Sequence, residues 1–285
     1  TGCVHSKDGY AGTMTFTEAM ETTKIHSISG ILPPGASLVT QRPFRSPHHT
    51  MSAASLAGGG SIPVPGEVSL AHNGVLFLDE LPEFPKTITD NLRQPIEDRR
   101  VTITRALGRV TYPCTFMLVA AMNPCRCGFF GHPTRKCTCG KGEVQRYISK
   151  ISGPLLDRLD LHIEVPPVDF EALSNREKEE SSAKIRERVN AARKIQQERY
   201  NGTGITCNAR LNSKLLREYC ILTEEASRIL KIAFEKMNMS ARAYDRILKV
   251  ARTIADLDGA QIIDTRHIMQ AVQFRSLDRK YWGNT

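Results

Sequence analysis

Three short, predominantly apolar runs, at 75–78, 116–121 and 161–165, constrain the fold of this chain more than any other feature of its sequence. Each run has the length of a strand and is bounded by polar or turn residues, which is typical of strands buried in a parallel sheet. Stretches with helical character separate the runs. This alternation predicts an α/β layer architecture with a mostly parallel sheet.

The composition changes to helix-forming residues after Pro166 and Pro167. Patterned helices are predicted at 170–200, 211–219, 223–237, 241–257 and 265–275. We therefore expect an α/β core over 15–168 and a separate all-α domain over 169–285. The chain has 285 residues, 40% of them hydrophobic, which is enough to bury the cores of two domains.

Charge and targeting signals narrow the class of protein. The chain has 39 lysines and arginines against 30 acidic residues, a formal net charge of +9 that is compatible with a polyanionic partner such as DNA. The sequence contains no run of 18 apolar residues and no secretion signal at its start. We expect a cytoplasmic protein.

Local signals define three elements of the first part. Thr15 and Glu18 have the spacing of a capping box and Gly30 ends the pattern, so a helix is predicted over 15–29. The segment 31–72 is rich in Gly, Pro, Ser and His and is predicted to be a long functional loop. The alternating residues of 101–112 predict a β-hairpin that projects, with Arg105 and Arg109 at its tip.

Polar residues follow the first two predicted strands. Asp79 and Glu80 come directly after 75–78, an arrangement in which nucleotide hydrolases place one carboxylate on Mg²⁺ and one on the attacking water. Asn123 follows the second strand, where its amide could orient water or contact a γ-phosphate. Ligands bind at the carboxyl ends of strands in open α/β sheets. The simpler interpretations are a solvated acidic turn and an ordinary Asn-Pro turn.

Two arginines are candidates for contact with a nucleotide. Arg158 ends a short predicted helix before the third run, where it could reach the nucleotide of a neighbouring subunit, or form an intrachain pair with Asp157 or Asp160. Arg242 lies near the start of the predicted helix 241–257, with Ser240 as N-cap. It shares one face with Arg246 and Lys249, and such faces are most often solvated.

Four of the eight cysteines form the pattern Cys125-x-Cys127 and Cys137-x-Cys139, a thiolate set suited to tetrahedral zinc. His132, inside the same loop, is a possible substitute ligand. The alternative is a set of reduced surface cysteines in a Gly/Pro-rich loop. His48 and His49 are adjacent, so phosphate contact or solvation is expected there rather than a metal site.

Joined in this order, the motifs resemble the AAA+ ATPases of the magnesium-chelatase-like group, of the ComM/YifB type. The resemblance covers about residue 15 to 278. It is carried by RPFRSPHHT, GVLFLDELPEFP, LRQPIEDRRVTITRALGRVTYP, LVAAMNPCRCGFFGHP, SGPLLDRLDLHIEVP and SARAYDRILKVARTIADL. It implies an AAA+ core, magnesium chelatase ChlI-like, followed by a helical lid.

The resemblance also implies roles for the candidate residues. Asp79 and Glu80 become the Walker B pair, with Mg²⁺ on Asp79; Asn123 becomes sensor 1, Arg158 the arginine finger and Arg242 the sensor 2 contact to ATP. The segment 31–72 corresponds to the helix 2 insert and 101–112 to the pre-sensor 1 hairpin, which would bring Arg105 and Arg109 to DNA at the pore of a hexameric ring. The implied activity is a DNA branch-migration helicase that acts in natural transformation.

One departure from the family pattern concerns the P-loop, G-x-x-x-x-G-K-[ST], whose amides and lysine hold phosphates. The sequence does not contain this motif, and residues 1–14 do not resemble the family. We expect a C-terminal part of a longer protein that alone hydrolyses little ATP. Two other functions stay open: a motor subunit for metal insertion into a porphyrin, and a non-catalytic fragment that binds DNA or partner subunits.

Overall fold

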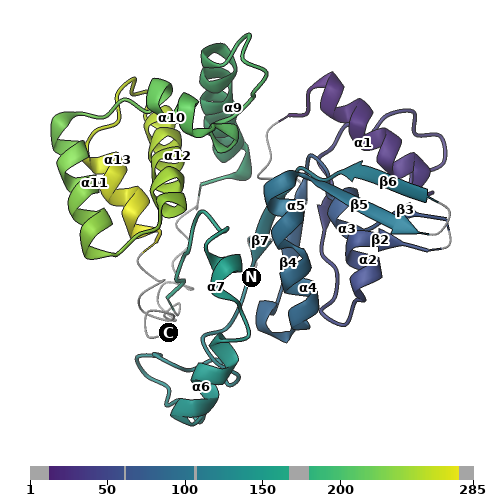
Figure 1. The fold of residues 1–285 in the computed structure, drawn as a ribbon, viewed down its shortest axis with the longest axis horizontal. Coiled ribbons are helices and arrows are strands. Elements are labelled where there is room, and N and C mark those ends of the chain that lie inside the picture. The colour runs from purple at the N-terminus through teal and green to yellow at the C-terminus, as the bar shows by residue number, and fades with distance from the viewer. Residues whose placement is uncertain (1–12, 61, 106–107, 167–179, 276–285) are drawn as a thin grey trace. The chain divides into compact units, whose positions relative to one another are not determined.

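The computed structural model describes residues 13–60, 62–105, 108–166 and 180–275. The chain divides into two compact units, one formed by Thr13–Leu159 and one that contains the chain from Asp160 onward. Figure 1 shows the strands in the first unit and a set of helices in the second. This is the mixed α/β architecture with a helical C-terminal part that the sequence predicts. The expected boundary at 168 lies outside the described residues.

A parallel three-stranded sheet organises the first unit. Its order is β1 (Phe44–Arg45), β4 (Val75–Leu78) and β7 (Met117–Ala120). The register pairs Phe44 with Val75 and Leu78 with Ala120. β4 is central, and its residues Leu76, Phe77 and Leu78 are buried. The predicted strands 75–78 and 116–121 are therefore confirmed.

β1 lies inside the segment 31–72, which the sequence predicts to be a loop. It is only two residues long, so it carries no alternating pattern to detect. The chain passes very close to β4 at this point: a Cβ on Gly74 would lie 2.0 Å from the carbonyl oxygen of Pro43. Gly74 is thus the residue that lets β1 enter the sheet beside β4.

The rest of the segment 31–72 also contains short elements. The structure has α2 (Ala53–Ala57), the two-stranded pair β2 (Gly58–Gly59) and β3 (Val64–Pro65), and α3 (Glu67–Leu70). Arg45 joins β1 to α3 through hydrogen bonds of 2.7 Å and 2.6 Å from its guanidinium to the carboxylate of Glu67. The expectation of a loop is wrong for these parts. They are ordered by contacts between residues that are far apart in the sequence, and such contacts leave no local pattern.

The third predicted strand, 161–165, does not form. The side chains of its apolar residues are exposed, with 46% of Leu161, 66% of Ile163 and 80% of Val165 accessible to solvent. A strand needs a neighbour to accept and donate its backbone hydrogen bonds. The described residues provide no partner strand here; instead the amide of His162 donates to the carbonyl of Phe274 at 2.8 Å.

The first unit also contains several helices. α1 (Phe16–Ile28) begins at the predicted capping box: the hydroxyl of Thr15 accepts from the amide of Glu18, and the Glu18 carboxylate accepts from the amide of Thr15. The remaining elements are η1 (Leu81–Glu83), α4 (Lys86–Asn91), α5 (Arg93–Asp98), α6 (Lys141–Ile148) and α7 (Gly153–Leu156).

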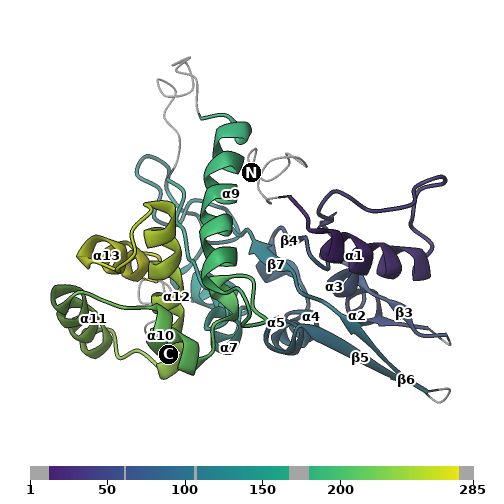
Figure 2. The same cartoon turned by 90° about the horizontal axis from the view of Figure 1, so that it is seen from above.

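A long antiparallel hairpin is formed by β5 (Arg100–Arg105) and β6 (Gly108–Pro113), as predicted. Its register pairs Arg105 with Gly108, and the tip residues 106 and 107 lie outside the described residues. Near its base the hydroxyl of Tyr112 donates to the carbonyl of Pro63 at 2.8 Å. In Figure 2 the two strands run outward from β4 and β7.

The second unit is built from helices around one hydrophobic core. They are α9 (Ser182–Arg199), η2 (Asn208–Arg210), α10 (Ser213–Tyr219), α11 (Glu224–Lys236), α12 (Ala241–Leu257) and α13 (Thr265–Gln273). The predicted helices from 211 onward are confirmed, including Ser240 as the N-cap of α12. Leu230, Ile247 and Ile268 are buried in the shared core. For the prediction 170–200, the first residues lie outside the described part.

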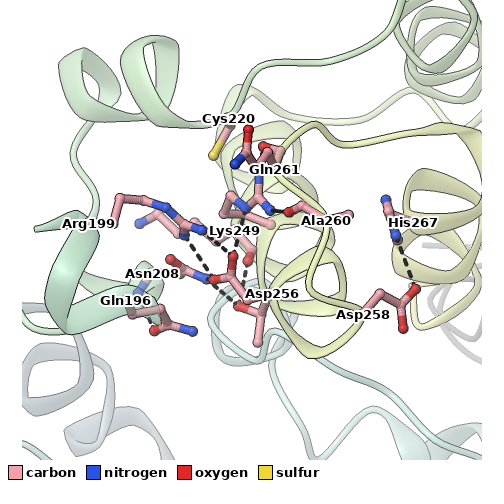
Figure 3. Close-up of polar contacts among 12 residues, drawn as sticks. Gln196, Arg199, Asn208, Cys220, Lys249, Asp256, Asp258, Ala260, Gln261 and His267 are labelled. Carbon is pink, nitrogen blue, oxygen red and sulfur yellow. Dashed lines mark hydrogen bonds and ion pairs between the residues drawn. The ribbon is translucent and has the colours of Figure 1, made fainter. Parts of the chain in front are cut away.

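A buried polar network joins α9, η2 and α12 (Figure 3). Asp256 and Arg252 are 2% and 1% exposed. The carboxylate of Asp256 accepts from Arg252 Nε at 3.1 Å, from Asn208 Nδ2 at 2.8 Å and from Arg199 Nη1 at 2.9 Å. The two terminal nitrogens of Arg252 donate to the carbonyls of Ala260 and Gln261, just beyond α12. Every charge in this network therefore has a partner.

Candidate functional site

The carboxyl ends of β4 and β7 bring two of the predicted polar segments together. Asp79 and Glu80 follow β4, and Asn123 follows β7 by three residues. Two backbone hydrogen bonds tie the segments at this edge: the amide of Ala121 donates to Leu78 at 2.9 Å and that of Leu81 to Ala121 at 3.0 Å. All three polar residues are exposed at this edge.

Glu80 has an unusual backbone conformation for its residue type. Its φ of 53° and ψ of 45° lie in the left-handed region, which costs a non-glycine residue about 1–2 kcal/mol. The amide of Glu80 donates to Asp79 Oδ1 at 2.9 Å, which offsets part of this cost. Such strain is concentrated at functional sites. The turn directs two consecutive carboxylates to the edge of the sheet.

His49, for which the sequence predicts phosphate contact or solvation, contacts this turn. Its Nδ1 lies 3.3 Å from Glu80 Oε2. The His49 ring lies 4.1 Å from the ring of His48 and meets Phe84 edge-on at 6.3 Å. His49 and Glu80 are 31 positions apart in the chain, so only the fold reveals this contact. His49 is a residue of the site that the sequence did not identify as a partner of Glu80.

The chemistry of these donors fits a hard divalent cation. Carboxylate oxygens are the ligands that Mg²⁺ accepts in proteins, usually one or two beside several waters. Asp79 and Glu80 are exposed, so both can contact a hydrated ion or a water molecule. The residues present at this edge can therefore hold Mg²⁺ through Asp79 and orient water through Glu80.

Arg158 lies at the end of α7 and is largely buried, with 14% of its side chain exposed. Its Nη2 lies 2.9 Å from Glu97 Oε1 on α5, and its Nη1 donates to the carbonyl of Pro154 at 2.6 Å. An intrachain ion pair is therefore formed, with Glu97 as partner. Asp160 instead pairs with Arg246 at 2.6 Å.

Arg242 belongs to the second unit, on the first turn of α12, and is exposed. The other two cations of the predicted face make contacts within this unit. Arg246 pairs with Asp160, and Lys249 Nζ donates to the carbonyl of Ala209 at 3.5 Å. The expectation of a merely solvated face is thus wrong for these two residues.

The four cysteines converge on one point. Their sulfur atoms all lie within 4.8 Å of one another. The distances from Cys125 to Cys127 and Cys137 are 3.4 Å and 3.7 Å, and Cys127 lies 3.5 Å from Cys137. Zinc–sulfur bonds are about 2.3 Å, so sulfurs at the corners of a zinc tetrahedron lie about 3.8 Å apart. The cluster can hold a metal ion. Among the described residues it consists of the four cysteines, and His132 is not one of its members.

Local electrostatics differ among the thiols of the cluster. Backbone N–H groups of Phe129 and Thr138 lower the pKa of Cys127 to about 5, whereas burial raises the pKa of Cys137 to about 12. The amide of Phe130 also donates to the Cys125 sulfur at 3.3 Å. Such N–H···S bonds support thiolate ligands in metal centres. A divalent cation would remove the repulsion that opposes ionising four neighbouring thiols.

The hairpin presents part of its predicted basic tip. Arg109 is exposed on β6 and forms no ion pair among the residues that the structure describes. The side chain of Arg105 lies outside the described part. Glu97 and Asp98, the acids nearest in sequence to the hairpin, are engaged with Arg158 and Gln94. Because these two acids contact other residues, Arg109 remains available to a ligand.

Within the described residues, no helix is long and apolar enough to cross a membrane.

Sequence profiles place both units in one family. The profile of the magnesium chelatase ChlI subunit matches residues 9–173, and that of the ChlI C-terminal region matches residues 179–275. The first match begins inside the segment 1–14 that we expected to lie outside the family.

Curated bacterial proteins are similar to the chain along most of its length. It is 47% identical over 240 residues to "Uncharacterized protein YifB" of Escherichia coli and to "Competence protein ComM" of Haemophilus influenzae, which covers 84% of the chain and 46% of each relative. It is 38% identical over 268 residues to "Uncharacterized protein Rv2897c" of Mycobacterium tuberculosis, covering 94% of the chain and 53% of the relative. The chain thus spans about half the length of these relatives.

Proposed function

The chain belongs to the magnesium chelatase ChlI family, an AAA+-type family, and we propose that it is part of an ATP-driven motor that remodels DNA, as a ComM-type branch-migration helicase. The observation that carries the proposal is the edge of the sheet at which β4 and β7 end. There a strained, exposed Glu80 stands beside Asp79, directly after β4 in the sheet whose order and register are given above. A motor of this kind would work in the cytoplasm, where DNA is present.

We assign the hydrolytic roles by the chemistry of each side chain. Asp79 would hold Mg²⁺, Glu80 would orient and deprotonate the attacking water, and the amide of Asn123 would contact the γ-phosphate of ATP. When bound, Mg²⁺ would neutralise charge on the β- and γ-phosphates of ATP. The family resemblance implies that Arg242 also contacts the phosphates of ATP. His49 holds the Glu80 carboxylate in position through the 3.3 Å contact.

Assembly would complete the site. Arg158 acts in the proposal as an arginine finger toward a neighbouring subunit of a homo-oligomer, with a hexameric ring as its form. Its ion pair with Glu97 keeps the guanidinium at a defined place beside the base of the hairpin. A guanidinium fixed in this way is pre-organised for phosphate, since less side-chain freedom is lost on contact.

The four cysteines are proposed to hold one structural zinc ion. Four sulfur ligands leave no open coordination position, so the ion would stabilise the loop rather than take part in the reaction. Cys125 is two residues from Asn123, and a metal there would fix the chain directly after β7.

DNA is the proposed substrate, gripped by the exposed Arg109 and by Arg105 on the hairpin. Contacts to phosphates make binding largely independent of base sequence and steeply dependent on salt. The alternative within the family, metal insertion into a porphyrin, predicts no response of ATP turnover to DNA. A non-catalytic fragment predicts DNA binding without turnover in any form of the protein.

ATP turnover in the presence and absence of DNA tests the proposal. The protein to use carries a P-loop segment ahead of residue 15, because the 285-residue sequence contains no G-x-x-x-x-G-K-[ST] motif. We expect DNA to stimulate turnover, and Glu80→Gln to reduce it by about 10²–10⁴-fold, as loss of a general base does. Glu83→Gln is the matched control three residues away. ATP turnover that is unchanged by DNA, or that is unchanged in Glu80→Gln, contradicts the proposal.

A further inference from the structure

The segment 125–150, which we name the cysteine module, is strongly basic. It contains a single acidic residue, Glu143, against six basic ones: Arg126, Arg135, Lys136, Lys141, Arg146 and Lys150. A zinc ion with four thiolates carries a charge of −2, so the module remains positive after metal binding. The excess of positive charge is therefore larger than the charge that would neutralise the metal–thiolate cluster.

The exposed cations of the module are available to a ligand. Arg126, Lys136 and Arg146 are exposed and form no ion pair among the described residues. The acid of the module is already engaged, because the Glu143 carboxylate accepts from the amide of Gly140 at 2.9 Å at the start of α6. Unneutralised charges gathered on one short segment favour a polyanion as ligand.

Aromatic rings lie among these cations. The guanidinium of Arg135 lies 5.2 Å from the centre of the Phe129 ring, and His132 meets the same ring edge-on at 5.7 Å. Phe130, the next residue, is 42% exposed. Cations that track a phosphate backbone, beside an aromatic face on which bases stack, are the features that bind single-stranded nucleic acid.

The module is linked to the turn after β4 through α6 and Lys150. Lys150 pairs with Glu83 at 3.3 Å, and Val144, Tyr147 and Ile148 of α6 are buried. Burial and the neighbouring carboxylates of Glu83 and Glu80 raise the pKa of Tyr147, so α6 lies close to the turn that carries Glu80. With the cysteine cluster fixing the preceding loop, the surface loses little freedom on binding a ligand.

We propose that the cysteine module is a second nucleic-acid contact of this protein, which binds single-stranded DNA through Arg126, Lys136 and Arg146 and stacks a base on Phe130. The inference rests on the proposed DNA function. It adds to the hairpin a binding surface next to the candidate hydrolytic edge. The competing explanation is that the cations only neutralise the metal–thiolate cluster.

Fluorescence anisotropy of a labelled dT₃₀ strand, titrated with salt, separates the two explanations. The test variant is Arg126→Gln/Lys136→Gln/Arg146→Gln. The matched control, Lys184→Gln/Lys194→Gln/Lys231→Gln, removes the same charge from exposed lysines of the second unit. Each lost phosphate contact lowers the slope of log K against log salt by about 0.7 for a single strand. We expect the test variant to lose about 2 units of slope and the control almost none.

Zinc content and a second variant complete the test. The triple variant should retain its metal, measured by release to a chromogenic chelator. Phe130→Ala should weaken dT₃₀ binding about 5- to 100-fold, in line with the loss of one stacked base, whereas Phe130→Tyr should bind normally. An unchanged slope overturns the inference, whether zinc is retained or lost.

Failure of the inference is distinguishable from failure of the proposed function. If the unmodified chain binds dT₃₀ and Arg109→Gln reduces its salt slope while the triple variant does not, only the module is excluded. If the unmodified chain does not bind DNA at any salt concentration, both the proposed function and the inference are overturned.

Discussion

Two carboxylates of this protein occupy opposite environments. Asp256 of the second unit is 2% exposed and is surrounded by donors from Arg199, Arg252 and Asn208. Glu80 of the first unit is exposed and meets a single histidine, His49. A buried charge is tolerated only when its partners are in place, and losing one partner is costly. The first carboxylate is therefore built for stability, whereas the second remains open to water and ligand.

The backbone conformations of Asp256 and Glu80 also differ. Asp256 lies in the regular α12 helix, while Glu80 adopts left-handed angles between β4 and η1. A strained position persists only because the surrounding structure holds it. In this protein the hydrogen bonds from Ala121 and Leu81 at the ends of β4 and β7 provide that support. The comparison teaches that the fully paired carboxylate is buried in the helical unit, whereas the carboxylate at the sheet edge of the other unit stays exposed.

The largest expected effect comes from breaking the buried network. Asp256→Ala leaves two arginines without their carboxylate in the interior, which costs about 3–5 kcal/mol. Asp245→Ala is the matched control on the same helix, because among the described residues Asp245 accepts a single, 3.4 Å hydrogen bond, from Ser213. It should cost less than about 1 kcal/mol. Urea unfolding followed by circular dichroism measures both. Equal losses would show that Asp256 does not hold the second unit together.

Removing metal from the cysteine cluster should have the next largest effect. A ligand at a hundred times its Kd stabilises the folded form by about 2.7 kcal/mol, so chelation should loosen the module by this order. The metal should also be lost as pH falls, because protons compete for the thiolates. Elemental analysis is expected to give about one zinc per chain, and hydrogen exchange of residues 125–150 to rise after chelation.

Serine replacements provide the control for this measurement. Cys137→Ser should abolish zinc binding, whereas Cys207→Ser, outside the cluster, should leave it unchanged. Metal content near zero in protein purified without chelator would contradict the zinc site.

The smallest expected effect concerns the strained turn. Glu80→Gly removes the steric cost of the left-handed angles but adds conformational freedom to the unfolded chain. Because these two effects oppose each other, the free energy of unfolding should rise by less than about 1 kcal/mol. Glu83→Gly is the comparison three residues away, where no positive φ is present and glycine brings only loss. A destabilisation by Glu80→Gly that exceeds that of Glu83→Gly would mean that the turn carries no strain.

Local signals in the sequence predicted a large share of the fold. The capping box of Thr15 and Glu18, the N-cap Ser240 and the hairpin pattern each act over a few residues, so their elements form as expected. The apolar run of β4 was likewise sufficient, because it is central and buried. At the candidate site, the sequence predicts polar residues at the ends of two strands, and the pairing of β4 with β7 in the structure brings these ends together.

Contacts between distant segments were not predictable in the same way. β1 is two residues long and enters the sheet only because Gly74 leaves room beside Pro43. The run 161–165 has the pattern of a strand, but no partner strand is among the described residues. The ion pair of Arg158 with Glu97 and the contact of His49 with Glu80 each join residues far apart in the chain. No local pattern encodes such pairs.

The most direct test of the account compares Glu80→Gln with Asp256→Asn in the form of the protein that carries a P-loop segment. ATP turnover per folded molecule and the free energy of unfolding are measured for both variants. We predict that Glu80→Gln loses at least about a hundredfold in turnover while its stability changes by less than about 1 kcal/mol. Asp256→Asn should lose several times more stability and keep its turnover per folded molecule. If Glu80→Gln retains turnover within a few-fold of the unmodified protein, the central claim is wrong.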